Sequence, residues 1–478
     1  MKTTHIILGL VGSVVLFLPL SNILGLTTKN EPIVPEANTS PNFAKVSQIF
    51  QNKCVDCHSP GMTRMPIYAD LPIAKQLMAS DIENASARLQ ISKAMYSGGS
   101  AFTPLMLARL EGALRNNTMP PALYLSMHWN DSLNQSEKST ILTWIGEERA
   151  KLATNKDVMP ALKGEPIQPL SIKANLDANK VALGKQLFFD IRLSGDNTLN
   201  CASCHSLAKG GTDQAKVATG IRGQQGPINS PSVYNAGYNI AQFWDGRAKD
   251  LVEQAAGPVA NPGEMGAEWD HVIETLNQVE DYRSAFASLY PEQGLTKSTV
   301  TQAIATFEES LVTTNSRFDQ YLNGRIESLS SDEKQGYELF KDHCASCHFG
   351  PSLGGQSFEK MGREQNYFQL RGGPLTEADN GRFNVSKQEA DRHLFKVSNL
   401  RNVEITYPYF HDGSVAALKD AVKIMARVQR GKILTDDEAE KIVAFLKTLT
   451  GEYQGKPLTQ LREDDFKSVT EEATIFAN

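Results

Sequence analysis

Hydrophobic residues recur three and four positions apart in three short stretches of this chain, which is the period of a helix with one buried face. Each stretch ends shortly before a Cys-x-x-Cys-His pentapeptide, and together they span residues 42–53, 179–190 and 331–342. A longer stretch with the same period follows later in each third of the chain, at 136–150, 297–311 and 436–449. The pattern therefore predicts one helical unit that is repeated three times.

Helix start signals and the remaining pattern agree with this prediction. Ser330 with Glu333, and Thr435 with Glu438, have the spacing of a capping box, in which the paired side chains satisfy backbone N–H groups at a helix start. Gly, Pro and Asn concentrate in the long connections between the helices. The sequence shows no sustained alternation of apolar and polar residues, so we expect a mainly α fold with little sheet.

The amino-terminal stretch has a different pattern. Residues 6–26 form an uncharged, mostly apolar run that begins four positions after Lys2. As a helix this run would extend roughly 31 Å, which is enough to cross a bilayer. We therefore predict an inner-membrane anchor within residues 1–30, with a cleavable signal peptide as the alternative. In both cases Lys2 favours the cytoplasmic side for the amino terminus, so the rest of the chain is exported.

The length and the net charge of the chain limit its possible domain organisation and partners. A chain of 478 residues is too long for one compact core, so several domains are expected. The formal net charge of −6 is mild and gives no basic footprint. We therefore expect no nucleic-acid partner.

The six cysteines carry the most specific signal. All of them belong to the pentapeptides, which read CVDCH at 54–58, CASCH at 201–205 and CASCH at 344–348. Disulfides would not require the histidine, and structural zinc sites pair two such motifs, whereas this chain has three. Cys-x-x-Cys-His is the attachment signature of haem c. The sequence therefore predicts three covalent haem groups, attached at Cys54 and Cys57, Cys201 and Cys204, and Cys344 and Cys347, with His58, His205 and His348 as proximal iron ligands.

The second axial ligand decides what each haem does. An iron with two protein ligands transfers electrons, whereas an iron with a vacant position can activate a small molecule. For the first haem we predict Met119, in NNTMPPALY, and Met127 and His128 compete for the role. For the third haem we predict Met425, with a place in the helix core as the alternative.

The middle haem is followed by a single methionine within its own domain. This is Met265, in NPGEMGAEW, and Glu264 stands directly before it. The residues alone leave two possibilities open. Either Met265 closes the middle iron, or Glu264 lies over a vacant one.

These observations predict a mainly α fold class, with three consecutive cytochrome c-like haem domains after an N-terminal membrane anchor. The Pro-rich sequence KGEPIQPL at 163–170 is typical of a linker between the first two domains. The expected boundaries are 31–160 for the N-terminal haem domain, 161–325 for the middle domain and 326–478 for the last. The C-terminal tail is a candidate to pack back on the middle domain.

Long strings between Pro166 and the C-terminus carry a family resemblance. They read, in order, LGKQLFFDIRLSGDNTLNCASCH, GGTD, QFWDGRAKDLVEQAAGPVANPGEM, TNSRFDQYL, GRF and LRNVEITYPYFHDG. This part of the chain resembles the bacterial di-haem cytochrome c peroxidases of the periplasm. The first 150 residues resemble a separate haem-binding module with CVDCHS and MPP. The whole chain is similar to the membrane-anchored tri-haem peroxidases, which include quinol peroxidases.

The resemblance implies an enzyme that reduces hydrogen peroxide to water with electrons from quinol or cytochrome c. It makes the haem at 201–205 the peroxidatic one. The haem at 344–348, ligated by His348 and Met425, would store and deliver electrons. The predicted membrane anchor and the first haem together favour quinol as the electron donor. Soluble cytochrome c is the alternative donor.

The resemblance also implies roles for single residues. Glu264 matches the family's distal acid–base carboxylate, Gln254 its hydrogen-bonding partner, and Trp244 a tryptophan between the two haems. A buried carboxylate suits proton transfer within peroxide, because burial raises its pKa toward neutrality. Asn229, Thr406 and Pro408 match positions where the family holds a calcium ion at a domain interface. His411 matches a histidine of the family near that interface.

One departure from the family pattern lies in the loop GGTDQAKVATGIRGQQGP. Many relatives have a histidine here that closes the peroxidatic iron until the other haem is reduced. This chain has Ile221 at that place and no histidine from 206 to 270. We therefore expect an enzyme that needs no reductive activation.

Other functions compete with the peroxidase. The chain could be a multihaem electron-transfer cytochrome or a peroxide sensor without turnover, in which Met265 closes the middle iron. A related class of enzymes oxidises aromatic residues of a partner protein, and that class has a tyrosine where this chain has Met425. A homodimer is suggested only by analogy with di-haem relatives.

Overall fold

The computed structural model describes residue 20 and residues 34–466, except 37–38, 60, 63–64, 66, 99–100, 127, 129–130 and 173–174. Apart from Leu20, the predicted anchor at 6–26 lies outside the described residues. Within the described part, no helix is both long enough and apolar enough to cross a bilayer. The chain divides into two compact units, an N-terminal unit of Met1–Thr154 with Lys163–Glu165 and a C-terminal unit of Asn155–Leu162 with Pro166–Asn478.

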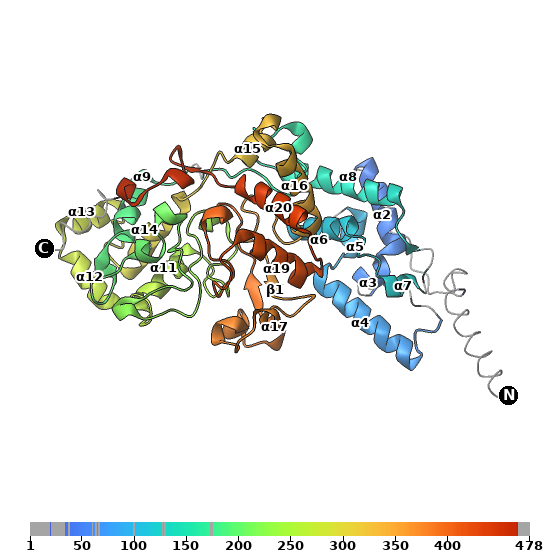
Figure 1. Cartoon of the computed structure of the whole chain (residues 1–478), viewed down its shortest axis with the longest axis horizontal. Helices are drawn as coiled ribbons and strands as arrows, with labels where there is room; N and C mark the ends of the chain where they lie inside the picture. Colours follow the sequence, from blue (N-terminus) through green and yellow to red (C-terminus); the bar gives the residue numbers. More distant parts are fainter. Residues whose placement is uncertain are drawn as a thin grey trace. The chain divides into compact units, whose positions relative to one another are not determined.

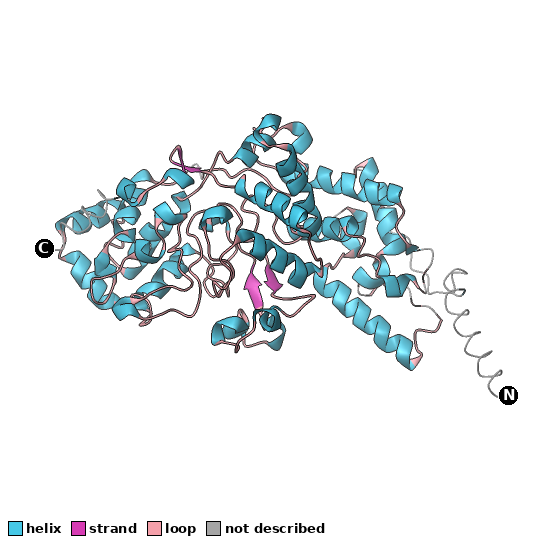
Figure 2. Ribbon diagram, in the orientation of Figure 1, coloured by secondary structure: helices cyan, strands magenta, loops and turns pink. Residues whose placement is uncertain are grey.

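Helices dominate both units (Figure 2). Among the described residues, sheet is limited to two antiparallel pairs of short strands: β1 (Phe358–Lys360) with β2 (Leu394–Lys396), and β3 (Glu452–Tyr453) with β4 (Lys456–Pro457). The expectation of a mainly α fold with little sheet is confirmed for this part of the chain. The capping boxes expected at Ser330 and Thr435 are both present.

The N-terminal unit packs its helices around an aromatic core. Its helices are α2 (Pro41–Lys53), α3 (Val55–His58), α4 (Pro72–Arg88), α5 (Lys93–Ser97), α6 (Pro104–Arg115), α7 (Ala122–Leu125) and α8 (Gln135–Leu152). The ring of Phe50 on α2 contacts Tyr96, Phe102 and Trp144, with centroids 6.4, 6.0 and 5.8 Å away. These contacts fix α2 against α8, so the first attachment pentapeptide starts from a rigid helix end.

The C-terminal unit holds two haem-attachment pentapeptides and two main cores. Its helices are α9 (Ala178–Phe188), α10 (Cys201–Cys204), α11 (Leu251–Ala260), α12 (Trp269–Asn277), α13 (Glu280–Leu289), α14 (Lys297–Ser310), α15 (Arg317–Leu322), α16 (Ser331–His343), α17 (Tyr367–Arg371), α18 (Phe383–Ser386), α19 (Leu418–Arg430) and α20 (Asp436–Lys447) (Figure 1). The first core joins α9 and α11 to α14, and the second joins α15, α16 and α20.

Both cores of the C-terminal unit contain the same helix crossing. The helix before the attachment pentapeptide crosses a later helix at a glycine, Gly184 of α9 against α14 and Gly336 of α16 against α20. A Cβ at Gly184 would overlap the carbonyl oxygen of Ala303, and one at Gly336 would overlap that of Lys441. The close approach therefore requires glycine at both crossings.

The last described segment returns to the first core of the C-terminal unit. Phe466 stacks on Phe189, with ring centroids 6.1 Å apart, and Glu463 accepts a hydrogen bond of 2.7 Å from the Ser206 hydroxyl. In Figure 1 the red end of the chain runs beside α9. Chain that follows the second core in sequence thus completes the first.

Candidate functional site

The three attachment pentapeptides have the same local geometry. In each, the histidine N–H donates to the carbonyl oxygen of the first cysteine, which closes one helical turn. None of the six cysteines forms a disulfide. Burial raises the pKa of the Cys54 thiol to about 12 and that of the Cys344 thiol to about 12, so these groups stay neutral. Thioether attachment of haem requires reduced cysteine pairs, and all three pairs are free.

The three histidines are oriented as iron ligands. The Nδ1 atom of each faces a backbone carbonyl oxygen, which can only accept a hydrogen bond, so Nδ1 carries the proton and Nε2 keeps its lone pair. Burial also lowers the pKa of each ring, which favours the neutral form. The contacts are 2.7 Å from His58 to Leu89, 3.3 Å from His205 to Gly211 and 3.0 Å from His348 to Leu353.

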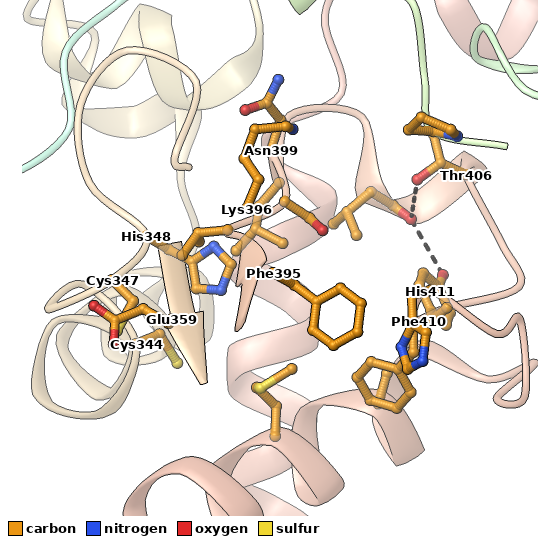
Figure 3. A pocket seen from close by; sticks show the side chains of 18 of the residues that line it. Cys344, Cys347, His348, Glu359, Phe395, Lys396, Asn399, Thr406, Phe410 and His411 are labelled. Carbon is orange, nitrogen blue, oxygen red and sulfur yellow. Dashed lines mark hydrogen bonds between the residues drawn. The ribbon is translucent and has the colours of Figure 1, made fainter. Parts of the chain in front are cut away.

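A large cavity lies beside the third pentapeptide. In Figure 3, Cys344, Cys347 and His348 lie on one side of it, and Phe410 and His411 on the other. Two methionines line the same cavity, Met425 on α19 and Met361 after β1. Both sulfur atoms are therefore candidates for the iron, and the structure adds Met361 to the predicted Met425.

The walls of this cavity suit a haem. Apolar and aromatic side chains dominate the lining near Phe395 and Leu446. Lys396 also lines it and is 8% exposed, and within the described residues no carboxylate pairs with its Nζ. Burial lowers the pKa of Lys396 to about 8. A buried cation without a counter-ion, next to a thiol pair and an imidazole, fits a group that carries carboxylates, as haem does.

The loop that follows Met119 lies near the first pentapeptide. Met119 itself is half-buried in a turn after α6. Burial raises the pKa of Cys57 to about 11, and the charge of Asp131 on this loop adds to the effect. The His128 ring stacks on Tyr124, with centroids 3.8 Å apart, and its Nδ1 lies 3.0 Å from the Tyr124 carbonyl oxygen. Met127 lies outside the described residues, and the role of Met119 stays a prediction.

Glu264 occupies a loop directly after α11, close to the middle pentapeptide. Its carboxylate is half-buried and accepts a hydrogen bond of 2.8 Å from the Asn261 amide. Burial raises the pKa of Glu264, and the nearby guanidinium of Arg247 opposes the shift. Burial likewise raises the pKa of Cys204 to about 11, with contributions from the charges of Asp213 and Glu264. The carboxylate is thus within electrostatic reach of an attachment thiol.

Met265 and Gln254, the other residues considered for this site, differ in burial. Met265 is 5% exposed and belongs to the first core of the C-terminal unit. Gln254 lies on α11 and is half-buried. The raised pKa of the Glu264 carboxyl suits an acid–base role, and the choice between Glu264 and Met265 stays a prediction.

The loop around Ile221 is fixed to the Glu264 loop. The Ile221 N–H donates to the Glu264 carbonyl oxygen at 2.8 Å, and the Gln224 side chain donates to the Pro262 carbonyl oxygen at 2.9 Å. A Cβ at Gly266 would overlap the Ile221 side chain, which is 4% exposed. Ile221 therefore acts as an apolar contact that holds the backbone on which Glu264 stands.

Trp244, Asn229 and His411 form one connected group between the two cores. The Trp244 indole N–H donates to the Asn229 carbonyl oxygen at 2.9 Å, and the Asn229 N–H donates to the His411 carbonyl oxygen at 2.8 Å. The Trp244 and His411 rings lie 6.3 Å apart. The predicted calcium residues line the same cavity as this group: Asn229, Thr406 and Pro408.

A network of charged residues contacts His411, and it was not predicted from the sequence. His411 Nε2 lies 2.8 Å from Asp379 Oδ1, and Arg371 pairs with Asp379 at 2.7 Å and with Asp412 at 2.9 Å. Asp379, His411 and Asp412 present their ligand atoms within 4.8 Å of one another, which is a geometry that could hold a metal ion. The guanidinium of Arg371 pairs with both carboxylates and compensates part of their charge.

Comparisons with known proteins find similar families over three parts of the chain. Residues 178–327 match the family described as di-haem cytochrome c peroxidase, residues 16–147 match a haem-binding domain, and residues 333–450 match cytochrome c. The chain is 40% identical to the cytochrome c peroxidase Ccp of Escherichia coli over 453 residues, which is 93% of this chain and 96% of that protein.

Two further similarities cover the C-terminal part of the chain. The cytochrome c551 peroxidase of Nitrosomonas europaea is 48% identical over 289 residues, which is 60% of this chain and 85% of that protein. The crystal structure of a MauG-like protein associated with microbial copper homeostasis superposes with a TM-score of 0.51 at 28% identity, covering 60% of this chain and 93% of that one.

Proposed function

Since the chain belongs to the di-haem cytochrome c peroxidase family, and is therefore a periplasmic haem-dependent enzyme that reduces hydrogen peroxide to water, we propose that the haem bound at 201–205 is the peroxidatic one and that the haem bound at 344–348 supplies its electrons. The observation that carries this proposal is the half-buried carboxyl group of Glu264, whose pKa is raised, within electrostatic reach of Cys204. At the cavity of the second core, Met425 and Met361 offer sulfur ligands.

Three covalent haem c groups are proposed. The proposal is supported by three free thiol pairs, each followed by an imidazole whose Nε2 is available to iron. When bound, the middle haem supplies the redox centre at which the O–O bond of peroxide is cleaved. His205 would bind the iron of that haem, and Met119 with His58 would hold the first haem.

Glu264 moves the proton. It would take the proton from one peroxide oxygen and return it to the oxygen that leaves as water, because its raised pKa lets it act in both directions. Gln254 orients the substrate without titrating. Asn261 and the Ile221 loop keep the carboxylate in place, so no reorganisation is needed when peroxide enters.

The electron path follows the residues between the two cores. His348 and Met425 would hold the electron-supplying haem, and a methionine ligand raises haem potential, which suits acceptance of electrons. Trp244 would pass electrons on toward the peroxidatic haem, and its hydrogen bond to Asn229 fixes its ring. A calcium ion at Asn229, Thr406 and Pro408 would fix the loops that carry this path.

Quinol is proposed as the electron donor, delivered at a membrane to which residues 6–26 anchor the chain. The uncharged run and the additional N-terminal haem support this, since together they bring an electron entry point near the bilayer. A homodimer is a further proposal, by analogy with di-haem relatives.

Turnover of purified holoprotein tests the function and the donor together. Peroxide consumption is followed with a reduced quinol and with reduced cytochrome c in parallel, each with an enzyme-free control. We expect consumption of one peroxide per two electrons, faster with quinol. Turnover with cytochrome c but not with quinol would identify a soluble cytochrome as the donor. Absence of turnover with either donor would favour an electron carrier or a peroxide sensor.

The fixed Ile221 loop predicts activity without a lag. A fully oxidised sample should react with peroxide as fast as a partly reduced one, because isoleucine cannot bind iron and the loop is already fixed to Glu264. Stopped-flow mixing of both forms with peroxide measures this, with the spin state of the oxidised haems recorded first. An oxidised sample that is entirely low-spin and inert until reduced contradicts the prediction.

A further inference from the structure

Tyr367 lies in the apolar cluster that separates Trp244 from α19. It is 1% exposed, and Trp244 and Met425 both pack against the cluster that contains it. Its ring centroid is 5.3 Å from that of Phe410 and 6.1 Å from that of His411. A buried phenol therefore stands close to both the proposed electron relay and a proposed iron ligand.

The Tyr367 hydroxyl is built into a proton-accepting site. It donates to Asp412, with its oxygen 3.0 and 3.1 Å from the two carboxylate oxygens, and lies 2.9 Å from the Ser414 hydroxyl. Burial alone would raise the pKa of Asp412, but hydrogen bonds from Arg371 and Ser414 hold it below its usual value. Asp412 is therefore ionised and available as a base while Tyr367 keeps its proton.

The ring path from Trp244 to Tyr367 passes through His411. Centroids are 6.3 Å apart from Trp244 to His411 and 6.1 Å apart from His411 to Tyr367. The Trp244 N–H, in contrast to the Tyr367 hydroxyl, donates to the backbone carbonyl of Asn229, which is not a base. A hole on Trp244 would stay cationic in a half-buried site, whereas a hole on Tyr367 becomes neutral once the proton has left, and burial favours the neutral species.

From this geometry we propose that Tyr367 is a redox-active residue, which supplies an electron when peroxide reacts while no external donor is present, with its proton passing to Asp412. The inference rests on the peroxidase function proposed above. It adds a site at which an unused oxidising equivalent is held away from the peroxidatic centre.

The step is balanced. One peroxide oxidises the resting protein by two electrons, of which the peroxidatic haem gives one and Tyr367 the other, by way of His411 and Trp244. The Tyr367 O–H bond breaks, the proton binds a carboxylate oxygen of Asp412, and a neutral tyrosyl radical is left. The next electron from the donor reduces the radical, and Asp412 returns the proton. Arg371 stays paired with Asp379 throughout, so a buried charge remains compensated.

Electron paramagnetic resonance of peroxide-treated holoprotein tests this. Oxidised protein is mixed with hydrogen peroxide without donor and frozen within milliseconds to seconds. We expect a tyrosyl signal whose hyperfine pattern changes when the protein is grown with ring- or β-deuterated tyrosine. Tyr367→Phe should lose the signal, and Asp412→Asn, which removes the proton acceptor, should reduce its yield.

Tyr409→Phe is the matched control. Tyr409 lines the same cavity, but its hydroxyl donates to the Val403 carbonyl oxygen at 3.1 Å and not to a carboxylate. This variant should keep the full tyrosyl signal. Unchanged haem absorption in the oxidised and reduced forms of Tyr367→Phe shows that the fold is retained.

Different results would contradict the Tyr367 inference and the proposed peroxidase function. A tyrosyl signal that survives in Tyr367→Phe, or peroxide consumption by the unaltered protein without any tyrosyl signal, overturns the inference and leaves the peroxidase in place. Absence of peroxide consumption with every donor overturns the proposed function itself.

Discussion

Replacing Glu264 by glutamine is expected to lower kcat for peroxide reduction by a factor of about 10² to 10⁴, the usual contribution of a positioned acid–base group. Glutamine keeps the size of the side chain and can still contact Asn261, but it cannot accept the peroxide proton. The haem content and the absorption of the reduced haems should not change. Steady-state peroxide consumption, normalised to bound haem, measures the effect.

Glu268→Gln is the control for this substitution. Glu268 is exposed, stands four residues later and makes no side-chain cap to α12. Its replacement should leave kcat unchanged. Equal losses in both variants, or full activity in Glu264→Gln, would mean that the proton is moved by another group.

The pH dependence of peroxide reduction should reflect the titration of the same carboxyl group. The pKa of Glu264 is raised above the ordinary 4.5 by burial, so the group is protonated, and unable to take a proton from peroxide, up to a higher pH than a solvated glutamate. Activity should therefore fall on acidification through this raised pKa. Glu264→Gln should lack that acidic limb.

Replacing Met425 by leucine is expected to have the second largest effect. Leucine fills a similar volume but cannot bind iron, so the haem at 344–348 would lose its sulfur ligand and its potential should fall by roughly 0.1 V or more. Donor-driven turnover should fall with it. Spectroelectrochemical titration of the holoprotein measures the potential, and the far-red band of methionine-ligated ferric haem reports the ligand directly.

Met361→Leu is the matched control, because Met361 lines the same cavity. It should keep both the far-red band and the potential. The reverse result, with loss of the band only in Met361→Leu, would assign the sulfur ligand to Met361 and leave Met425 as a core residue of α19.

The features that could be predicted from the sequence are local in the chain. The six cysteines with their histidines, the helix periods and the capping boxes at Ser330 and Thr435 each depend on residues a few positions apart, and local spacing survives folding. The family strings then indicated Glu264 and Trp244. The residues alone left Glu264 and Met265 as alternatives, because adjacent positions in a loop do not reveal which side chain faces the haem.

The features that escaped prediction join distant parts of the chain. Asp379 and His411 are 32 residues apart, and the Ile221 backbone meets Glu264 only because two loops fold against each other. The buried, unpaired state of Lys396 also depends on tertiary packing. Such contacts have no period or spacing in the sequence, so only the three-dimensional arrangement reveals them.

The stacking of Phe466 on Phe189 has a consequence for the order of assembly. Residues near the very end of the chain are structural members of the core that surrounds the middle attachment pentapeptide. During synthesis and export that core cannot close until the final segment has emerged, whereas residues up to 449 suffice for the core that follows it. The core around the middle attachment pentapeptide is therefore expected to close after the core around the third.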